Sequence, residues 1–191
     1  MPKRRLVVGI SGSSAPIYGI RLLQVLQDHP EVETHLVMSD AARRTIALET
    51  DDWTPEKVVA LAHHSHGVKD IAAAVSSGSF QTAGMVIAPC SMKTLAAVAH
   101  AYSDDLLGRA ADVTLKERRP LILVVRETPL HLGHLRNMVA VTEMGGTVLP
   151  PVPAFYHRPR TVMDLVDHTL GKILDQLAIA HTLFQRWEGP K

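Results

Sequence analysis

The sequence has 191 residues, of which 46% are hydrophobic and 20% charged, a composition typical of one globular domain spanning residues 1–191. Its formal net charge of +1 gives no basic field of the kind that attracts nucleic acid. The single cysteine, Cys90, excludes a disulfide within the chain and favours a reducing compartment. The first apolar run ends at Gly9, which is too short for a signal peptide or a membrane span, so we expect a cytoplasmic protein.

Residues 6–19 predict a buried strand, a tight turn and the start of a helix. An apolar run gives way to Gly and Ser, and apolar residues then return at helical spacing. Gly9, Gly12 and Gly19 match neither the dinucleotide fingerprint nor the P-loop. A turn of small residues before a helix lets backbone N–H groups approach an anion closely, most often a phosphate. An ordinary tight turn explains this stretch equally well when it is taken alone.

The pattern of strand, small residue and helix then recurs. The spacing of apolar residues predicts a helix over 17–26 and a second strand over 32–38, and Ser39 and Asp40 are suitable N-caps for a helix over 41–48. Glu49 lies in the last turn of that helix, where the negative end of the helix dipole disfavours a carboxylate. A solvated helix end is the simpler explanation of Glu49 from this pattern alone.

Residues 53–75 predict a less regular helix that begins at a Thr-Pro-Glu cap. Three histidines, His63, His64 and His66, are grouped in this region. No Cys, Asp or Glu accompanies them at the spacing of metal ligands, so we interpret them as part of a solvated loop.

The third clear strand is predicted over 84–88, where Pro89 stops it, and Ser91 is expected to cap a helix over 92–101. Lys93 and Thr94 fall in the first turn of that helix. A lysine there opposes the helix dipole unless it contacts a phosphate or carboxylate, so this is a second candidate anion site. Cys90 has no nearby base that would activate it as a nucleophile.

The second half of the chain continues the alternation of strands and helices. Helices are predicted over 104–117, 132–144 and 161–177, and strands over 120–125 and 147–149. A proline-rich ordered loop is predicted over 150–159. Asp112 and Lys116, four residues apart, are expected to pair. Arg126 and Glu127 follow the most apolar strand, at the edge where parallel sheets bind ligands. This order of strands and helices predicts an α/β fold with a doubly wound parallel sheet between two helical layers. We expect a core over about residues 5–180 and a C-terminal helix and tail over 161–191.

Five stretches together resemble the flavin prenyltransferase (UbiX-like) family, whose members are also known as small partners of aromatic-acid decarboxylases. The resemblance covers residues 6–177 and implies a Rossmann-like fold. The implied reaction transfers a dimethylallyl group from dimethylallyl monophosphate to N5 and C6 of reduced FMN. The resemblance implies in addition that the reaction needs no metal. It also implies a product used by UbiD-type decarboxylases, and a homododecamer with flavin sites at subunit contacts. The matching stretches are residues 9–14, 88–94, 109–117, 126–130 and 153–156.

The resemblance further implies roles for individual residues. Glu49 would act as the base on the flavin, and Glu127 would protonate the departing phosphate with Ser14 nearby. Lys116, Arg126, Tyr156 and Lys172 would bind that phosphate. FMN would be held by Gly12, Ser13, Ser14, Ser39, Ser91, Met92, Lys93, Thr94 and Arg126.

Three features depart from the common family pattern. Ala15-Pro16 stands where Gly-Ala is frequent, Asp105 replaces a common Asn, and Lys172 replaces an Arg that would bind phosphate in a bidentate way. Two other functions stay open from the sequence: an FMN-dependent cysteine decarboxylase of the same fold, and a non-catalytic flavin-binding subunit of a decarboxylase. The sequence leaves open which decarboxylase is served and whether the donor is a monophosphate or a diphosphate.

Overall fold

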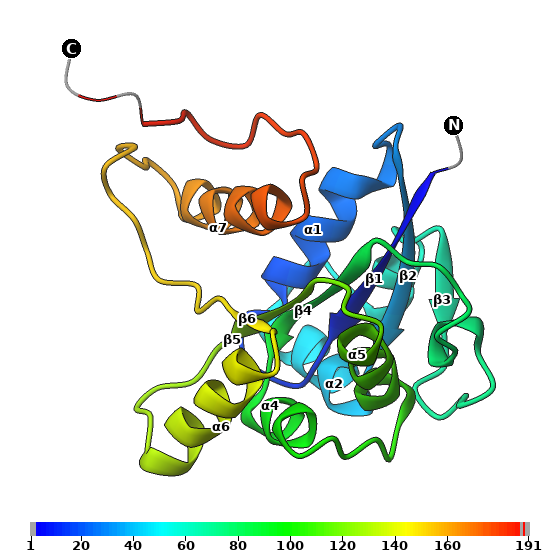
Figure 1. Cartoon of the computed structure of the whole chain (residues 1–191). Coiled ribbons are helices and arrows are strands. Elements are labelled where there is room, and N and C mark those ends of the chain that lie inside the picture. Colours follow the sequence, from blue (N-terminus) through cyan, green and yellow to red (C-terminus); the bar gives the residue numbers. More distant parts are fainter. Residues whose placement is uncertain (1–2, 188, 190–191) are drawn as a thin grey trace.

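The computed structural model describes residues 3–187 and 189 and contains one six-stranded parallel sheet (Figure 1). Its strand order is β3-β2-β1-β4-β5-β6, the arrangement of a doubly wound sheet. The strands are β1 (Arg4–Ile10), β2 (Val32–Met38), β3 (His64–His66), β4 (Gly84–Cys90), β5 (Leu121–Val125) and β6 (Thr147–Val148).

Helices cover both faces of this sheet, which confirms the predicted three-layer architecture (Figure 1). One cluster of buried side chains joins the sheet to α1, α2, α3 and α7, and a second joins it to α4, α5 and α6. The alternation along β1 produces this division, since Leu6 and Val8 belong to the first cluster and Val7 to the second. The helices are α1 (Ile17–Gln27), α2 (Asp40–Glu49), α3 (Pro55–Val59), α4 (Met92–Ala99), α5 (Leu106–Lys116), α6 (Leu132–Glu143) and α7 (Val162–Gln176), with a 3₁₀ turn η1 (Ala74–Ser76).

The predicted helix over 53–75 is wrong beyond its first turns. Thr54 caps α3 as expected, but α3 ends at Val59, and His64–His66 form the edge strand β3, which pairs with β2. The cause is a contact with a distant part of the chain. The His63 N–H donates to Thr34 Oγ1 at 3.1 Å, and the Thr34 N–H donates to His63 Nδ1 at 3.2 Å, which aligns this segment with β2.

Two smaller expectations are also corrected. Pro89 does not stop β4, which continues to Cys90 through a shift in its register with β5. Such a shift accommodates a residue that has no N–H to donate. Lys116 pairs with its neighbour Glu117, and Asp112 pairs with Arg109 at 2.8 Å, so the predicted Asp112–Lys116 pair does not form.

The segment between β6 and α7, predicted to be an ordered loop, has no helix or strand over 149–161 and extends away from the sheet before α7 begins (Figure 1). Thr161 and Asp164 form a capping box that starts α7, as its position predicted. No helix among the described residues combines the length and apolar character needed to cross a lipid bilayer. The division into a core over about 5–180 and a C-terminal part over 161–191 stays a prediction.

Candidate active site

The turns that follow β1, β2 and β4 meet at the carboxyl edge of the sheet and are tied together by hydrogen bonds. The Ser39 N–H donates to Ile10 O at 3.0 Å. The Ser11 hydroxyl donates to Pro89 O at 2.9 Å and accepts from the Ser91 N–H at 2.7 Å. The turns at Ser11, Ser39 and Ser91 are therefore held in fixed positions relative to one another.

Among the helices that begin at this edge, α2, α4 and α5 are each capped by a polar side chain. Ser39 accepts from the Ala42 N–H at 3.1 Å, Ser91 from the Thr94 N–H at 3.3 Å and Asp105 from the Gly108 N–H at 2.8 Å. These caps leave other N–H groups of the first turns of α2, α4 and α5 free to bind a ligand. Convergent helix N-termini create a positive potential that favours an anion.

A cavity of about 630 Å³ lies between these first turns. Its volume falls within the range of sites that hold a small molecule or cofactor. Positive and negative groups both face it, since Arg44, Lys69 and Lys93 line it together with Asp40, Asp104 and Asp105. The other lining residues are Gly12, Ser39, Ala41, Val68, Ser91, Thr94, Ala97, Leu107 and Gly108.

Gly12 sits where the β1–α1 turn packs directly against the start of α2. A Cβ atom added at Gly12 would overlap the Cβ of Ala41, and the Ala41 backbone carbonyl carbon lies only 3.1 Å from the same point. The side-chain hydrogen of glycine thus lets the turn approach α2 and form part of the cavity wall.

Ser14 and Glu49 are brought together beside this turn. Glu49 Oε2 accepts hydrogen bonds from the Ser14 hydroxyl at 3.0 Å and from the Ala15 N–H at 2.8 Å. Both bonds hold the carboxylate in one orientation beside the β1–α1 turn. The geometry presents Glu49 as a proton acceptor with a defined orientation.

Ala15 adopts a left-handed backbone conformation with φ of 68°. This conformation costs a residue with a Cβ roughly 1–2 kcal/mol, whereas glycine adopts it freely. The departure at Ala15 therefore adds strain to the turn, and the hydrogen bond from its N–H to Glu49 helps to hold it.

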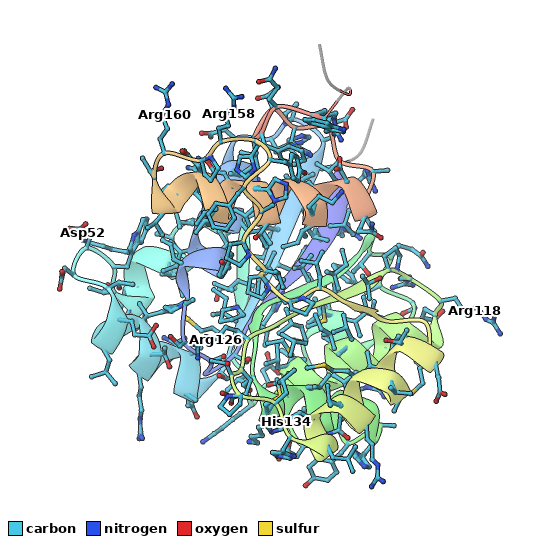
Figure 2. All side chains as sticks on the ribbon, turned by 90° about the vertical axis from the view of Figure 1, so that its left-hand side faces the viewer. Asp52, Arg118, Arg126, His134, Arg158 and Arg160 are labelled. Atoms are coloured by element: carbon cyan, nitrogen blue, oxygen red, sulfur yellow. The ribbon has the colours of Figure 1, made fainter. Side chains whose placement is uncertain are left out.

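Arg126 and Glu127 follow β5 at the same edge. The Ser13 hydroxyl donates to Arg126 O at 2.6 Å and the Arg126 N–H donates to Cys90 O at 3.2 Å, so Arg126 lies against the first turn. Figure 2 shows Arg126 at the centre of one face, between the cyan α2 and the green and yellow helices. Glu127 is exposed and accepts from the Thr128 N–H at 2.9 Å.

The other three predicted phosphate ligands lie elsewhere in the same chain. Lys116 is the last residue of α5, whose eleven residues span roughly 16 Å from the cavity to the opposite edge of the sheet. The Tyr156 hydroxyl bonds His168 Nε2 at 2.6 Å, and Lys172 lines a separate cavity beside α7. Figure 2 shows Arg118 and Arg158 at the margins of the view, away from Arg126. Arg118 follows Lys116 by two residues, and Arg158 follows Tyr156 by two.

Cys90 is fully buried, and burial raises the pKa of its thiol well above the ordinary value. The neutral thiol is a poor nucleophile. This agrees with the expectation that Cys90 does not act in catalysis.

The sequence did not identify several residues that line the cavity. Arg44 was within reach of sequence reasoning, because it follows Asp40 by four residues and so shares a face of α2 with the helix start. The position of Lys69 could not be predicted, because residues 53–75 were expected to form a helix. Both add positive charge at the cavity.

Comparison with known proteins agrees with this geometry over nearly the whole chain. The Flavoprotein family model matches residues 1–187. Flavin prenyltransferase UbiX of Escherichia coli K12 is 61% identical over 188 residues, covering 97% of this chain and 99% of the relative. The protein of the same name from Thauera aromatica is 56% identical over 185 residues, covering 97% and 94%.

Solved structures give the same result. The crystal structure of AnUbiX (PadA1) in complex with FMN and dimethylallyl pyrophosphate is 50% identical, with a TM-score of 0.96 over 99% of this chain and all of that one. A dodecameric FMN-dependent UbiX-like decarboxylase from Escherichia coli O157:H7 is 51% identical, with a TM-score of 0.94 over 97% of this chain. Cysteine decarboxylases SpaF and TvaF, at 21% and 17% identity, share the fold alone. The chain belongs to the UbiX family of flavin prenyltransferases.

Proposed function

We propose that this flavin prenyltransferase transfers the dimethylallyl group of dimethylallyl monophosphate to N5 and C6 of reduced FMN. We further propose that the prenylated flavin serves a UbiD-type decarboxylase and that the reaction takes place in the cytoplasm. The observation that carries the proposal is the cavity between the first turns of α2, α4 and α5, in a chain 61% identical to a flavin prenyltransferase. The AnUbiX structure, which contains FMN and dimethylallyl pyrophosphate, supports both ligand classes.

The cavity fits the phosphate-bearing part of FMN. Its wall combines a close-approach glycine, Gly12, with capped helix starts at Ser39 and Ser91 and the cations Lys93 and Arg44. Backbone N–H groups and lysine together are a strong donor set for a phosphate. We assign FMN binding to this wall and to the neighbouring residues Ser13, Ser14, Met92, Thr94 and Arg126.

When bound, reduced FMN supplies the electron-rich ring to which the prenyl group is added. The chain must then accept a proton, and Glu49 is the group placed to do so. Its carboxylate is oriented by the Ser14 hydroxyl and the Ala15 N–H, so one oxygen stays directed towards the β1–α1 turn. Glu127, beside Arg126 at the end of β5, is assigned as the proton donor to the departing phosphate.

The leaving phosphate must be neutralised by cations if no metal takes part. Arg126 lies at the site, but Lys116, Tyr156 and Lys172 lie on other parts of the same chain. We therefore infer that neighbouring copies supply these three residues and that the complete site forms at subunit contacts. Lys172 would then bind phosphate as a point charge, without the bidentate geometry of arginine.

Exposed apolar side chains support this assembly. On α6, Leu132, Leu135 and Val139 face solvent, and Phe155 is exposed in the loop beside Tyr156. Apolar groups clustered at a surface are typical of subunit interfaces. A relative at 51% identity is described as dodecameric, and we propose a dodecamer here as well.

A second candidate function is direct decarboxylation, or passive flavin binding within a decarboxylase. Two solved structures support this candidate. A UbiX-like decarboxylase is 51% identical to this chain, and the phenylacrylic acid decarboxylase of Aquifex aeolicus is 37% identical. The pairing of Ser14 with Glu49 argues for proton transfer, since passive binding has no use for an oriented carboxylate.

Mass spectrometry of the released flavin tests the proposal. Reduced FMN is incubated anaerobically with the purified protein and dimethylallyl monophosphate, and in a parallel sample with the diphosphate. The proposal predicts a flavin heavier by one C5H8 unit with the monophosphate. Bound but unmodified FMN with both donors would contradict it and would favour the second candidate. Product formed only with the diphosphate would contradict the choice of donor.

A further inference from the structure

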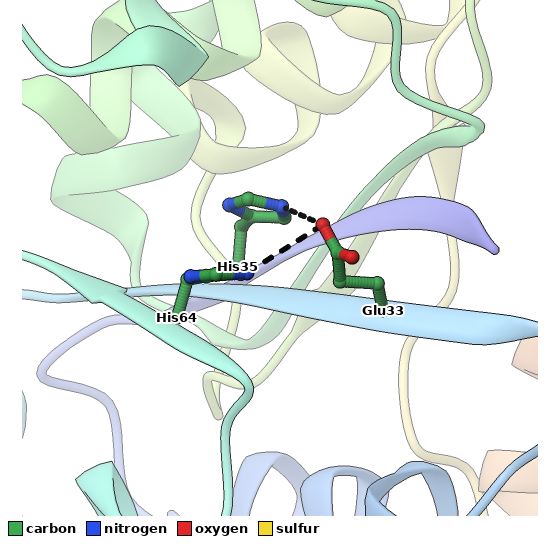
Figure 3. A group of neighbouring side chains, drawn as sticks. All are labelled: Glu33, His35 and His64. Carbon is green, nitrogen blue, oxygen red and sulfur yellow. Dashed lines mark hydrogen bonds and ion pairs between the residues drawn. The ribbon is translucent and has the colours of Figure 1, made fainter. Parts of the chain in front are cut away.

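Two histidines and a glutamate lie together at the β3 edge of the sheet. β3 is the edge strand, and His64 is the residue of β3 that stands opposite His35 of β2. Glu33 precedes His35 by two residues, so both side chains lie on the same face of β2. Figure 3 shows the two imidazole rings and the carboxylate of Glu33 converging on that face.

The ligand atoms are spaced as they would be around one metal ion. Glu33 Oε1 lies 3.1 Å from His35 Nε2 and 3.6 Å from His64 Nε2, and all three atoms fall within 4.8 Å of one another. Zinc bonds to imidazole nitrogen and carboxylate oxygen are about 2.0–2.2 Å long, which places tetrahedral ligand atoms roughly 3.3–3.6 Å apart. The rings of His35 and His64 are stacked with their centroids 4.7 Å apart, so the exposed His64 must turn towards the ion for both nitrogens and the carboxylate to bind it.

A further histidine supports the orientation of His35. His66 Nε2 lies 3.1 Å from His35 Nδ1, and the two rings are stacked with an interplanar angle of 8°. When His35 binds a metal through Nε2, its Nδ1 carries the proton and donates to His66. This is the outer hydrogen bond that metal-binding histidines commonly make.

Charge and access at the cluster are compatible with a divalent cation. His35 Nε2 and His64 Nε2 both face Glu33 Oε1, so a divalent cation bound there would be adjacent to a carboxylate that balances part of its charge. Arg5 Nε lies 3.4 Å from Glu33 Oε1, and this positive charge reduces the negative potential at the cluster. The Arg5 guanidinium also stacks over the ring of Phe80. The side chain of His35 is 6% exposed and that of His64 is 54% exposed, so the cluster opens to solvent on one side.

We propose that Glu33, His35 and His64 bind a divalent ion with the ligand preference of Zn²⁺, with water completing its coordination. Two imidazole nitrogens and one carboxylate favour zinc over Mg²⁺ or Ca²⁺, which prefer oxygen ligands only. The ion ties β3 to β2. Because β3 leads directly into Val68 and Lys69, which line the cavity, the ion also holds one end of that wall in place.

Zinc titration of the full chain tests the proposal. Protein stripped of metal by a chelator is titrated with Zn²⁺ by calorimetry at near-neutral pH, and its melting temperature is measured with and without the ion. The proposal predicts one saturable site per chain and a higher melting temperature with zinc, because the ion binds the folded form. Absence of saturable binding would overturn it.

Two variants separate this site from adventitious binding to other histidines. His64→Gln removes one ligand and is expected to weaken zinc binding by at least about tenfold. His100→Gln replaces an exposed histidine at the C-cap of α4 and is expected to leave zinc affinity unchanged. Stoichiometric zinc binding that persists at full affinity in His64→Gln would overturn the assignment. Circular dichroism verifies that both variants fold, and a Co²⁺ absorption band typical of a tetrahedral site, present in the wild type and lost in Glu33→Gln, provides an independent readout.

Discussion

Replacing Glu49 with glutamine is expected to lower the rate of prenyl transfer by about 10²–10⁴-fold while leaving FMN binding nearly unchanged. Glutamine keeps the size of the side chain and can still accept hydrogen bonds from Ser14 and Ala15, but it cannot take up a proton. The rate is measured as prenylated flavin formed per unit time, and FMN affinity as quenching of flavin fluorescence.

Glu143→Gln is the matched control for this experiment. Glu143 is the exposed last residue of α6, as Glu49 is the last residue of α2, so the same change at a similar helix position is made away from the site. Its rate should equal that of the wild type. Full turnover by Glu49→Gln would remove Glu49 from the mechanism.

Replacing Gly12 with alanine is expected to weaken FMN binding by roughly tenfold to a hundredfold. The new Cβ would overlap the Cβ of Ala41, and overpacking of this kind costs about 1–3 kcal/mol, or about one to two powers of ten in Kd. The turn must move away from α2, which deforms the wall of the cavity. Calorimetric titration with FMN measures the loss.

Two further variants show whether the steric account of Gly12 is correct. The double variant with Ala41→Gly removes the overlapping Cβ and should recover part of the affinity, because the Ala41 backbone remains close. Gly67→Ala should have little effect, since a Cβ there would lie 3.9 Å from Asp70 Cβ, an ordinary contact. Unchanged FMN affinity in Gly12→Ala alone would contradict the account.

Local signals predicted the cavity wall well. Ser39 and Ser91 are N-caps recognisable from the residues beside them, and the turn at Gly12 is recognisable from its small residues. The parallel order of the sheet then brings these turns to one edge whatever the details of packing. The fold class and the edge of the sheet where the cavity lies could therefore be predicted from the sequence.

Features that depend on distant contacts could not be predicted in this way. β3 exists because Thr34 binds His63 and aligns the segment with β2, and nothing within residues 53–75 indicates that pairing. The same pairing brings Glu33 and His35 to His64, so this grouping of possible metal ligands has no counterpart in the sequence around His63, His64 and His66. Lys69 was missed for the same reason.

The site residues that the structure separates pose a different problem. Lys116 ends α5, whereas Glu49 contacts the β1–α1 turn, so the cooperation proposed for these two residues requires contacts between copies of the chain. The exposed Leu132 and Phe155 are where we propose that copies meet, but a single chain does not define which copies would share a site.

Complementation between two inactive variants tests the shared site most directly. Lys116→Ala and Glu49→Gln are each purified, dissociated, mixed in equal amounts and reassembled, and prenylated flavin is measured. If Lys116 and Glu49 of one site come from different copies, about a quarter of the sites in a random mixture contain both wild-type residues. The account predicts recovery of about a quarter of wild-type activity. Activity that stays at the level of the separate variants would contradict it, because it would mean that each site takes both residues from one chain.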